Sequence, residues 1–235
     1  MTLYDDTVAP SLMRRQRSEM TAQDDLTAAA ESEWLQKWTT GPNEPLGAVL
    51  PPGSEAPNFV ARDDAGTHAE LEDFWADGPA LVMFWRHFGC GCGIERAKRL
   101  VAEVDDYREA GLNPVIIAQG EPTRAAAYRK KYAIPCPILC DPDHVAYRAF
   151  GIGQWAVEQV LFDIGPEWWS HTLEFGTQFQ DQRRSQDQPM VDDPWRATAE
   201  FVIAQDGVIR LAYAYQYCED YPDPRVLTTA AHLTR

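Results

Sequence analysis

A buried strand that leads through a cysteine-bearing turn into a helix is the feature that most constrains the fold of this chain. Residues 80–85 (ALVMFW) are apolar and are bounded by Gly78 and Pro79, which is typical of a strand buried on both faces. The turn, residues 86–93 (RHFGCGCG), carries two thiols and three glycines. From Ile94 apolar residues recur at helical spacing until Gly111. This pattern predicts two cysteines at the N-terminus of a helix.

Cysteines in such a position favour nucleophilic chemistry. Only the thiolate attacks, and the unpaired N–H groups and the positive dipole end of a helix N-terminus stabilise it. Arg86 and His87 are close enough in sequence to add positive charge. The candidate catalytic residues of the turn are therefore Cys90, Cys92, Arg86 and His87.

Length, charge and cysteine count limit the domain size, the partners and the role of any disulfide that we expect. A chain of 235 residues with 45% hydrophobic residues can bury a sizeable core, as one large domain or one domain with additions. Its net charge of −15 argues against nucleic acid or an anionic membrane surface as a partner. No run of ~18 apolar residues and no basic-then-apolar leader is visible, which predicts a soluble, cytoplasmic protein. Five cysteines do not suit a disulfide scaffold, so any disulfide is expected to be functional.

Strand and helix patterns alternate along the chain, which predicts an α/β fold with parallel strands and helical crossovers. Residues 1–50 are expected to form an N-terminal helical arm and linker, with a helix at 20–38 that packs on the domain or on a second copy in a homodimer. Residues 154–195 are a predicted insertion with one apolar helical piece and a flexible polar loop at 178–193. Strands are expected at 58–62, 113–119, 136–140, 200–204 and 208–215. Other helices are expected at 71–75, 122–132 (with Thr123 as N-cap), 142–150 and 225–233.

Four segments in this order resemble the thioredoxin-like fold and, within it, the peroxiredoxin-like alkyl hydroperoxide reductase/thiol-specific antioxidant family. They are residues 51–59 (PPGSEAPNF), 81–90 (LVMFWRHFGC), 132–143 (YAIPCPILCDPD) and 200–211 (EFVIAQDGVIRL). The resemblance implies a central mixed sheet flanked by helices over residues 51–235, and a thiol-dependent oxidoreductase with Cys90 as nucleophile. It implies a small-molecule oxidant or thiol substrate, an external thiol or thioredoxin as reductant, and no bound cofactor. Arg196 loosely resembles the arginine that polarises the peroxide in this family.

The cysteine pair departs from the patterns of these families. Thioredoxin-like proteins often read Cys-x-x-Cys-x-Glu, whereas here the second cysteine is Cys92 and Gly93 fills the usual place. The Pro-x-x-x-Thr-x-x-Cys of typical peroxiredoxins is missing too. Because Cys92 precedes Glu95 much as a peroxidatic cysteine precedes its Pro-x-Glu, Cys92 is the second candidate nucleophile. Thr198 stands where thioredoxin-like proteins place a cis-proline, which argues against protein-disulfide exchange.

A bond between Cys90 and Cys92 has a geometric condition. Residues two apart on a helix point roughly 200° away from each other. In an extended turn their Cα atoms are at most ~7 Å apart, which overlaps the ~4.4–6.8 Å of a disulfide. We therefore predict that the regular helix begins at or after Gly93, and that the pair cycles between dithiol and disulfide.

Two interpretations cover the remaining three thiols, and both apply to Cys140. Cys140 and Cys218 are expected near the same edge of the sheet, where either could resolve an oxidised Cys90 after local rearrangement. Cys136 and Cys140 also suit the role of small buried hydrophobes.

Two other classes of function stay open at this point. A metal site could form from Cys90, Cys92, His87 and a remote Cys or His, although structural zinc sites usually leave about two to four residues between neighbouring cysteines. The chain could instead be a redox-inactive thioredoxin-like binding module, whose contact surface is the tryptophan-bearing insertion.

Overall fold

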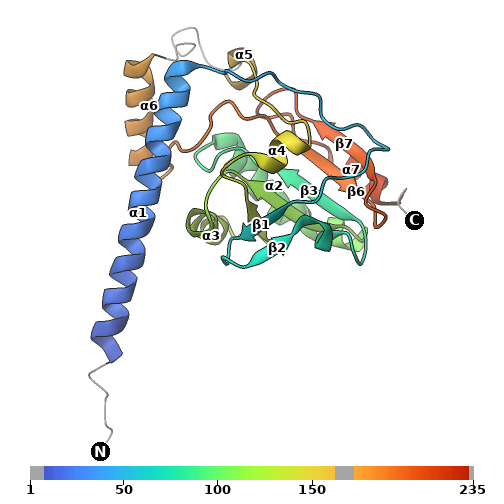
Figure 1. Ribbon diagram of the computed structural model, residues 1–235, viewed down its shortest axis with the longest axis horizontal. Coiled ribbons are helices and arrows are strands. Elements are labelled where there is room, and N and C mark those ends of the chain that lie inside the picture. The colour runs from blue at the N-terminus through green and yellow to red at the C-terminus, as the bar shows by residue number, and fades with distance from the viewer. Residues whose placement is uncertain (1–7, 162–171, 233–235) are drawn as a thin grey trace, which may run out of the picture.

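One mixed sheet organises the molecule, in the strand order β2-β1-β5-β4-β3-β6-β7 (Figure 1). The computed structural model describes residues 8–161 and 172–232, with side chains from residue 21 onward. The three central strands β5, β4 and β3 are parallel, and antiparallel strands extend the sheet on both sides. The predicted mixed sheet is confirmed, although β2 was not predicted. The strands are β1 (Val60–Asp63), β2 (His68–Glu70), β3 (Ala80–Phe84), β4 (Asn113–Ala118), β5 (Ile138–Cys140), β6 (Ala199–Ile203) and β7 (Ile209–Ala214).

Helices cover both faces of this sheet. One core contains residues of α2, α3 and α7, and the core on the opposite face contains residues of η1 and α4. None of the helices in the described ranges is both long and apolar enough to cross a membrane. The helices are α1 (Val8–Thr40), the 3-10 helix η1 (Leu71–Phe74), α2 (Gly91–Glu109), α3 (Pro122–Lys131), α4 (Val145–Ala149), α5 (Val157–Val160), α6 (Leu173–Ser185) and α7 (Pro224–His232).

The central strand β3 is buried on both faces, as its unbroken apolar run predicts. Successive side chains of a strand point to opposite faces. Leu81 and Met83 accordingly enter the core under α2, whereas Val82 and Phe84 enter the core under α4. All four side chains are at most 1% exposed. This double burial fixes the end of β3, and with it the cysteine turn that follows.

Several helices differ from their predicted bounds or caps. α1 begins at Val8, well before residue 20. α3 begins at Pro122 with Glu121 as its N-cap residue, so the prediction of Thr123 as N-cap is wrong. Proline suits the first helical position because the N–H that it lacks would have no intrahelical acceptor there. α6 continues to Ser185, so the first half of the predicted polar loop at 178–193 is helical.

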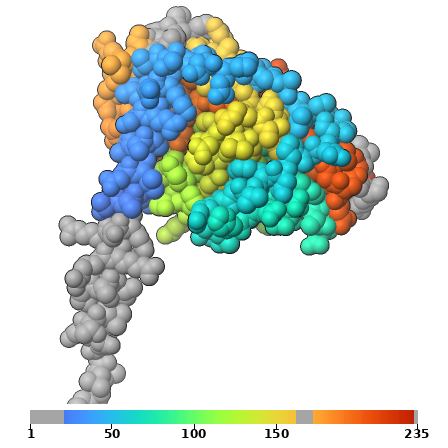
Figure 2. Space-filling view, viewed as in Figure 1, coloured from blue at the N-terminus to red at the C-terminus, as the bar shows by residue number. Residues whose placement is uncertain are grey.

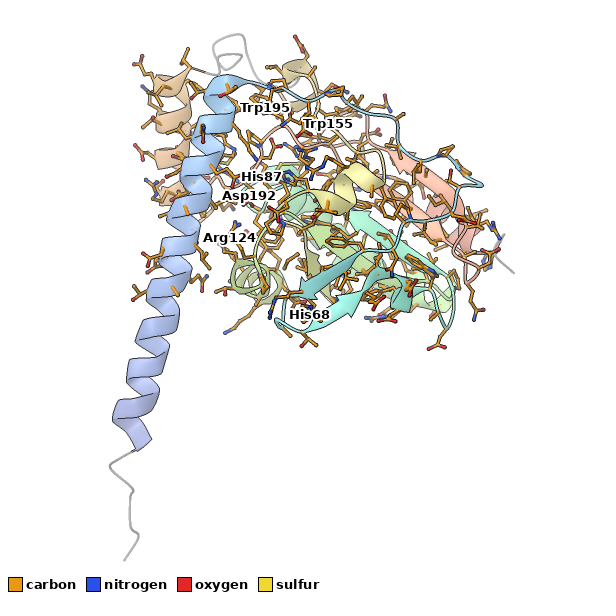
Figure 3. All side chains as sticks on the ribbon, in the orientation of Figure 1. His68, His87, Arg124, Trp155, Asp192 and Trp195 are labelled. Atoms are coloured by element: carbon orange, nitrogen blue, oxygen red, sulfur yellow. A yellow bond between two sulfur atoms is a disulfide. The ribbon has the colours of Figure 1, made fainter. Side chains whose placement is uncertain are left out.

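A tryptophan stack joins α1 to α6 and explains why this polar segment is helical. Trp38 stacks between Trp34 and Trp195, with ring centroids 5.0 and 5.1 Å away. All three rings are at most 1% exposed, and Phe175 and Phe179 of α6 pack against them. Figure 2 shows α1 and α6 side by side at one edge of the molecule, and Figure 3 places Trp195 beside the end of α1. The arm therefore packs on its own chain.

Candidate active site

The cysteine turn connects β3 directly to α2. The helix begins at Gly91, and Cys90 is its N-cap residue with an extended backbone (φ −69°, ψ 130°). The prediction that the helix starts at or after Gly93 is therefore wrong. Cys92 lies inside the first turn of α2, yet the two Cα atoms are only 5.4 Å apart. A close pair needs only Cys90 to leave the helical conformation, because its extended backbone directs its side chain back toward Cys92.

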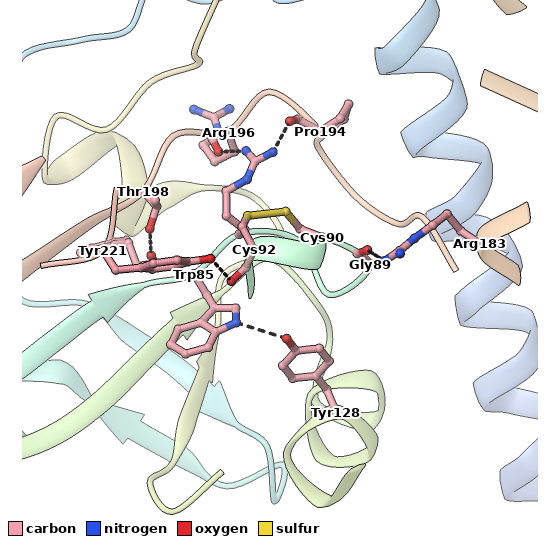
Figure 4. Close-up of a disulfide and its surroundings, with 12 residues drawn as sticks. Trp85, Gly89, Cys90, Cys92, Tyr128, Arg183, Pro194, Arg196, Thr198 and Tyr221 are labelled. Atoms are coloured by element: carbon pink, nitrogen blue, oxygen red, sulfur yellow. Dashed lines mark hydrogen bonds between the residues drawn. A yellow bond between two sulfur atoms is a disulfide. The ribbon is translucent and has the colours of Figure 1, made fainter. Parts of the chain in front are cut away.

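Three sulfur atoms meet at this point. Cys90 and Cys92 form a disulfide (Figure 4), and the Sγ atoms of Cys90, Cys92 and Cys218 all lie within 4.8 Å of one another. We call these three residues the sulfur cluster. Their residues are 9%, 6% and 8% exposed, so the cluster is close to the surface but largely covered. Cys218 comes from the loop after β7, as the expectation that it returns to this edge implied, whereas Cys140 does not belong to the cluster.

The N-terminus of α2 would stabilise a thiolate at Cys90 in the reduced protein. The first N–H groups of a helix have no intrahelical acceptor, and the side chain at the N-cap is the one placed to accept from them. In the disulfide form the side chain of Cys90 makes no such bond. A thiolate at Cys90 would occupy that acceptor position, where the positive end of the helix dipole favours the anion.

Arg86 is a buried cation beside the sulfur cluster. Its guanidinium donates to the carbonyl oxygens of Arg196 and Pro194, the latter at 2.6 Å, and lies 5.1 Å from the centre of the Trp155 ring. Burial raises the pKa of the Cys218 thiol, and the positive charge of Arg86 opposes that shift. Arg86 is 3% exposed, so little solvent screens its charge.

His87 does not add charge to this site. Its side chain is buried, and its Nδ1 has no hydrogen-bond partner among the described residues. Burial first, and then the positive charges of Arg86 and Arg183, hold the pKa of His87 well below its usual value. The imidazole is therefore neutral at neutral pH, which corrects the expectation that it assists thiolate formation. It is also not part of the sulfur cluster, so the predicted Cys–Cys–His metal set is not assembled in the described part of the chain.

Arg196 is directed away from the cysteines by a buried polar cluster. Its guanidinium pairs with Glu44 at 2.7 Å and Asp193 at 3.3 Å, and it donates to Nδ1 of His144 at 3.2 Å. Only its carbonyl oxygen reaches the site, as the acceptor for Arg86. The Arg196 guanidinium is thus held in this polar cluster, and it does not reach the cysteines as the expected role of peroxide-polarising cation would require.

Two contacts that hold the turn were not predicted. Tyr221 donates its hydroxyl hydrogen to the carbonyl oxygen of Cys92 at 2.9 Å, and Arg183 of α6 donates to that of Gly89 at 2.7 Å (Figure 4). These partners are 129 and 94 residues away in the sequence. No local pattern could have indicated them.

The other two thiols are inert in this arrangement. Cys136 and Cys140 are buried, and burial raises the pKa of each to about 12. Both stay protonated at neutral pH, as expected of small buried hydrophobes. They provide matched controls for the cysteines of the sulfur cluster.

The tryptophans of the predicted insertion do not form a contact surface where the structure describes them. Trp155 and Trp195 are fully buried, and Trp155 donates its ring N–H to the carbonyl oxygen of Tyr215 at 3.2 Å. Trp168 and Trp169 lie outside the described residues. The described tryptophans therefore serve the core, which removes the main argument for a binding module.

A parallel strand core with a cysteine at the N-terminus of the following helix defines a thioredoxin-like protein. Residues 52–212, more than half of the chain, match the AhpC/TSA family. The chain belongs to this family, and the resemblance seen in the sequence is confirmed.

Individual relatives match shorter stretches. The chain is 31% identical over 87 residues to a chloroplastic thioredoxin-like protein of Arabidopsis thaliana, covering 37% of this chain and 35% of that protein. It is 25% identical over 103 residues to peroxiredoxin Bcp of Escherichia coli, covering 44% of this chain and 65% of that one. Neither match spans two thirds of the relative.

Solved structures show the same fold. Peroxidoxin BcpB from Mycobacterium tuberculosis superimposes with a TM-score of 0.57 at 13% identity, covering 79% of this chain and 99% of that one. A thiol peroxidase from Chromobacterium violaceum gives a TM-score of 0.52 at 16% identity, covering 80% and 90%. The predicted thioredoxin-like fold is confirmed.

Proposed function

We propose that this protein is a thiol-dependent peroxidase in which Cys90 is the nucleophile and Cys92 its redox partner. The observation that carries the proposal is the position of Cys90 as N-cap residue of α2, within bonding distance of Cys92. The family and the fold support the same reaction class. A Cys-x-Cys pair replaces the Cys-x-x-Cys spacing here, so the resolving step takes place inside one turn of the chain.

The reaction proceeds in three steps that conserve atoms and electrons. The Cys90 thiolate attacks the distal oxygen of a peroxide, giving a sulfenic acid while the alkoxide or hydroxide leaves and takes a proton from solvent. The Cys92 thiol then displaces the sulfenic hydroxyl as water and closes the disulfide. An external thiol or thioredoxin reduces the pair by thiol–disulfide exchange. Arg86 is the buried positive charge that favours the anionic states, and no organic cofactor takes part.

The family supports a substrate class and a setting. We propose hydrogen peroxide or a small alkyl hydroperoxide as the oxidant, because the chain belongs to the AhpC/TSA family. The reductant requires a compartment that keeps thiols reduced, such as the cytoplasm.

Separate substitutions of the two cysteines test the assignment. Cys90→Ser should abolish the peroxide-dependent loss of free thiol above background, because the nucleophile is removed. Cys92→Ser should still lose one thiol at Cys90 but form no Cys90–Cys92 bridge. Cys136→Ser, a buried thiol outside the cluster, should react like the wild type. If Cys90→Ser keeps the wild-type rate and Cys92→Ser loses it, the two roles are reversed.

A second candidate function rests on the three sulfurs of the cluster. In the reduced protein they would offer a soft, three-coordinate set of ligands, which suits Cu(I) better than four-coordinate zinc. Metal analysis of reduced protein purified without chelator discriminates this candidate. A stoichiometric metal that is lost in Cys218→Ser would favour it over peroxidase chemistry.

A further inference from the structure

Cys218 is a buried thiol that the proposed reaction does not use, although it lies against the reacting pair. Its sulfur is within 4.8 Å of both sulfurs of the disulfide. It is 8% exposed, similar to Cys90 and Cys92. A thiol this close to a disulfide needs only a small displacement to attack it.

The loop that carries Cys218 is held in place on both sides. The backbone N–H of Cys218 donates to the carbonyl oxygen of Gln159 at 3.3 Å. Three residues later, Tyr221 donates to the carbonyl oxygen of Cys92 at 2.9 Å, so the loop is tied directly to the first turn of α2. Asp220 accepts from the backbone N–H of Gln216 at 2.8 Å and closes the loop on itself. The proximity of Cys218 to the pair is thus part of the packed structure.

Cys92 and Cys218 border the same small cavity. Both residues line the cavity of about 10 Å³, together with Arg86, whereas Cys90 does not line it. The positive charge of Arg86 opposes the effect of burial on the pKa of Cys218. Nothing larger than a water molecule fits in this cavity.

We propose that Cys218 is a third redox-active thiol, which exchanges with the Cys90–Cys92 disulfide and moves the bridge to Cys92–Cys218. This inference rests on the proposed function, because peroxide must first form the Cys90–Cys92 bridge. Cys218 loses its proton to solvent and attacks Sγ of Cys92. The Cys90–Cys92 bond breaks, the Cys92–Cys218 bond forms, and Cys90 leaves as a thiolate, so one disulfide is kept and no oxidant is consumed.

The leaving-group chemistry sets this direction. In thiol–disulfide exchange the sulfur with the lower pKa leaves faster. Cys90 holds the N-cap position, where the N–H groups of α2 stabilise its thiolate. Exchange therefore restores the nucleophile while the oxidising equivalent is stored between Cys92 and Cys218. The protein could then react with a second peroxide before it meets its reductant.

Tryptic peptides distinguish the two bridges directly. Cleavage after Lys and Arg leaves Cys90 and Cys92 together in residues 87–96, and Cys218 in residues 211–225. A Cys90–Cys92 bridge therefore stays within one peptide, whereas a Cys92–Cys218 bridge joins two. Reduced wild-type protein, Cys218→Ser and Cys136→Ser would each receive one equivalent of hydrogen peroxide. Samples would be quenched with acid at intervals, alkylated with N-ethylmaleimide, digested and analysed by mass spectrometry.

The expected result is a joined pair of peptides in wild type and Cys136→Ser, with the alkyl group on Cys90, and its absence from Cys218→Ser. The joined pair should appear after the bridge within residues 87–96 and should form faster at higher pH, because Cys218 must lose a proton. If only the bridge within residues 87–96 forms, the exchange is refuted while the proposed function stands. If neither bridge forms, the proposed function itself has failed.

Discussion

At the scale of single residues, the site depends on a close approach between the cysteine turn and the segment that follows α6. A Cβ atom on Gly89 would overlap the carbonyl oxygen of Pro189 and lie 2.8 Å from Cα of Met190. The neighbouring Gly91 has open space where a Cβ would be. Glycine is therefore required at the first position by packing, and only permitted at the second.

This contrast gives a prediction with its own control. Gly89→Ala should lower the free energy of unfolding by about 1–3 kcal/mol, the usual cost of overpacking, and should slow the reaction of Cys90 because the turn is displaced. Gly91→Ala should change the free energy of unfolding by less than about 0.5 kcal/mol. Urea unfolding and the rate of peroxide-dependent thiol loss measure both effects. Equal behaviour of the two variants would contradict the packing argument.

At the scale of elements, the arm α1 is bound to the molecule by its tryptophans. Trp38 is 1% exposed and stacks on both sides. Gly176 of α6 permits this approach, because a Cβ there would lie 2.8 Å from the Trp38 ring. The backbone of Glu31 adds a hydrogen bond from Gln180. Whether α1 also contacts a second copy stays a prediction.

Removal of the Trp38 ring should therefore lower the free energy of unfolding substantially. Trp38→Ala should destabilise the protein by about 3–5 kcal/mol, the range found for large-to-small changes in cores. Leu173→Ala, on an exposed side chain of α6, should cost less than about 0.5 kcal/mol. Denaturant unfolding followed by far-UV circular dichroism compares the two. A loss of less than about 1 kcal/mol in Trp38→Ala would show that the stack does not secure the arm.

The helices and strands also show how much of the fold the sequence alone predicts. Periodicity alone predicted β3, β4 and α2, because a strand buried on both faces and an amphipathic helix each have their own apolar spacing. It missed β2, since a strand of three residues with no buried side chain carries no such signal. It placed a loop where α6 continues, because the residues that stabilise that helix are supplied by α1. For the site, Cys90 and Cys92 were evident and Cys218 was expected near the same edge, whereas Tyr221 and Arg183 reach the turn only through the tertiary fold.

At the scale of the whole molecule, a buried polar cluster ties the linker after α1 to the sheet domain. Arg196 connects Glu44 of the linker to Asp193 and His144, and Nε2 of His144 lies 3.2 Å from Oε1 of Gln119. Since Arg196 donates to Nδ1, the imidazole is neutral with its proton on Nε2. Burial first, and then the charge of Arg196, lower the pKa of His144 to about 3.

This shift predicts that the protein loses stability in mild acid. The unfolded chain regains a histidine pKa of about 6.5, so between pH ~6.5 and ~3 the unfolded state binds more protons than the native state. Stability therefore falls as pH falls through that window, by about 1 kcal/mol from this residue between pH 7 and pH 5.5. His144→Asn should flatten that slope, because it removes the titrating imidazole. Asparagine is chosen because it tolerates the φ of +55° at this position. Exposed His68→Asn serves as control, and an unchanged slope in His144→Asn would contradict the assignment.

The reactivity of Cys90 itself remains the most direct measure of the account. In the reduced Cys92→Ser variant, the rate of alkylation by iodoacetamide can be followed against pH by the mass of the peptide of residues 87–96. If the N-terminus of α2 and Arg86 stabilise the thiolate, the midpoint will lie below the ~8.5 of an ordinary cysteine. A midpoint at or above ~8.5 would contradict the claim that this helix activates Cys90.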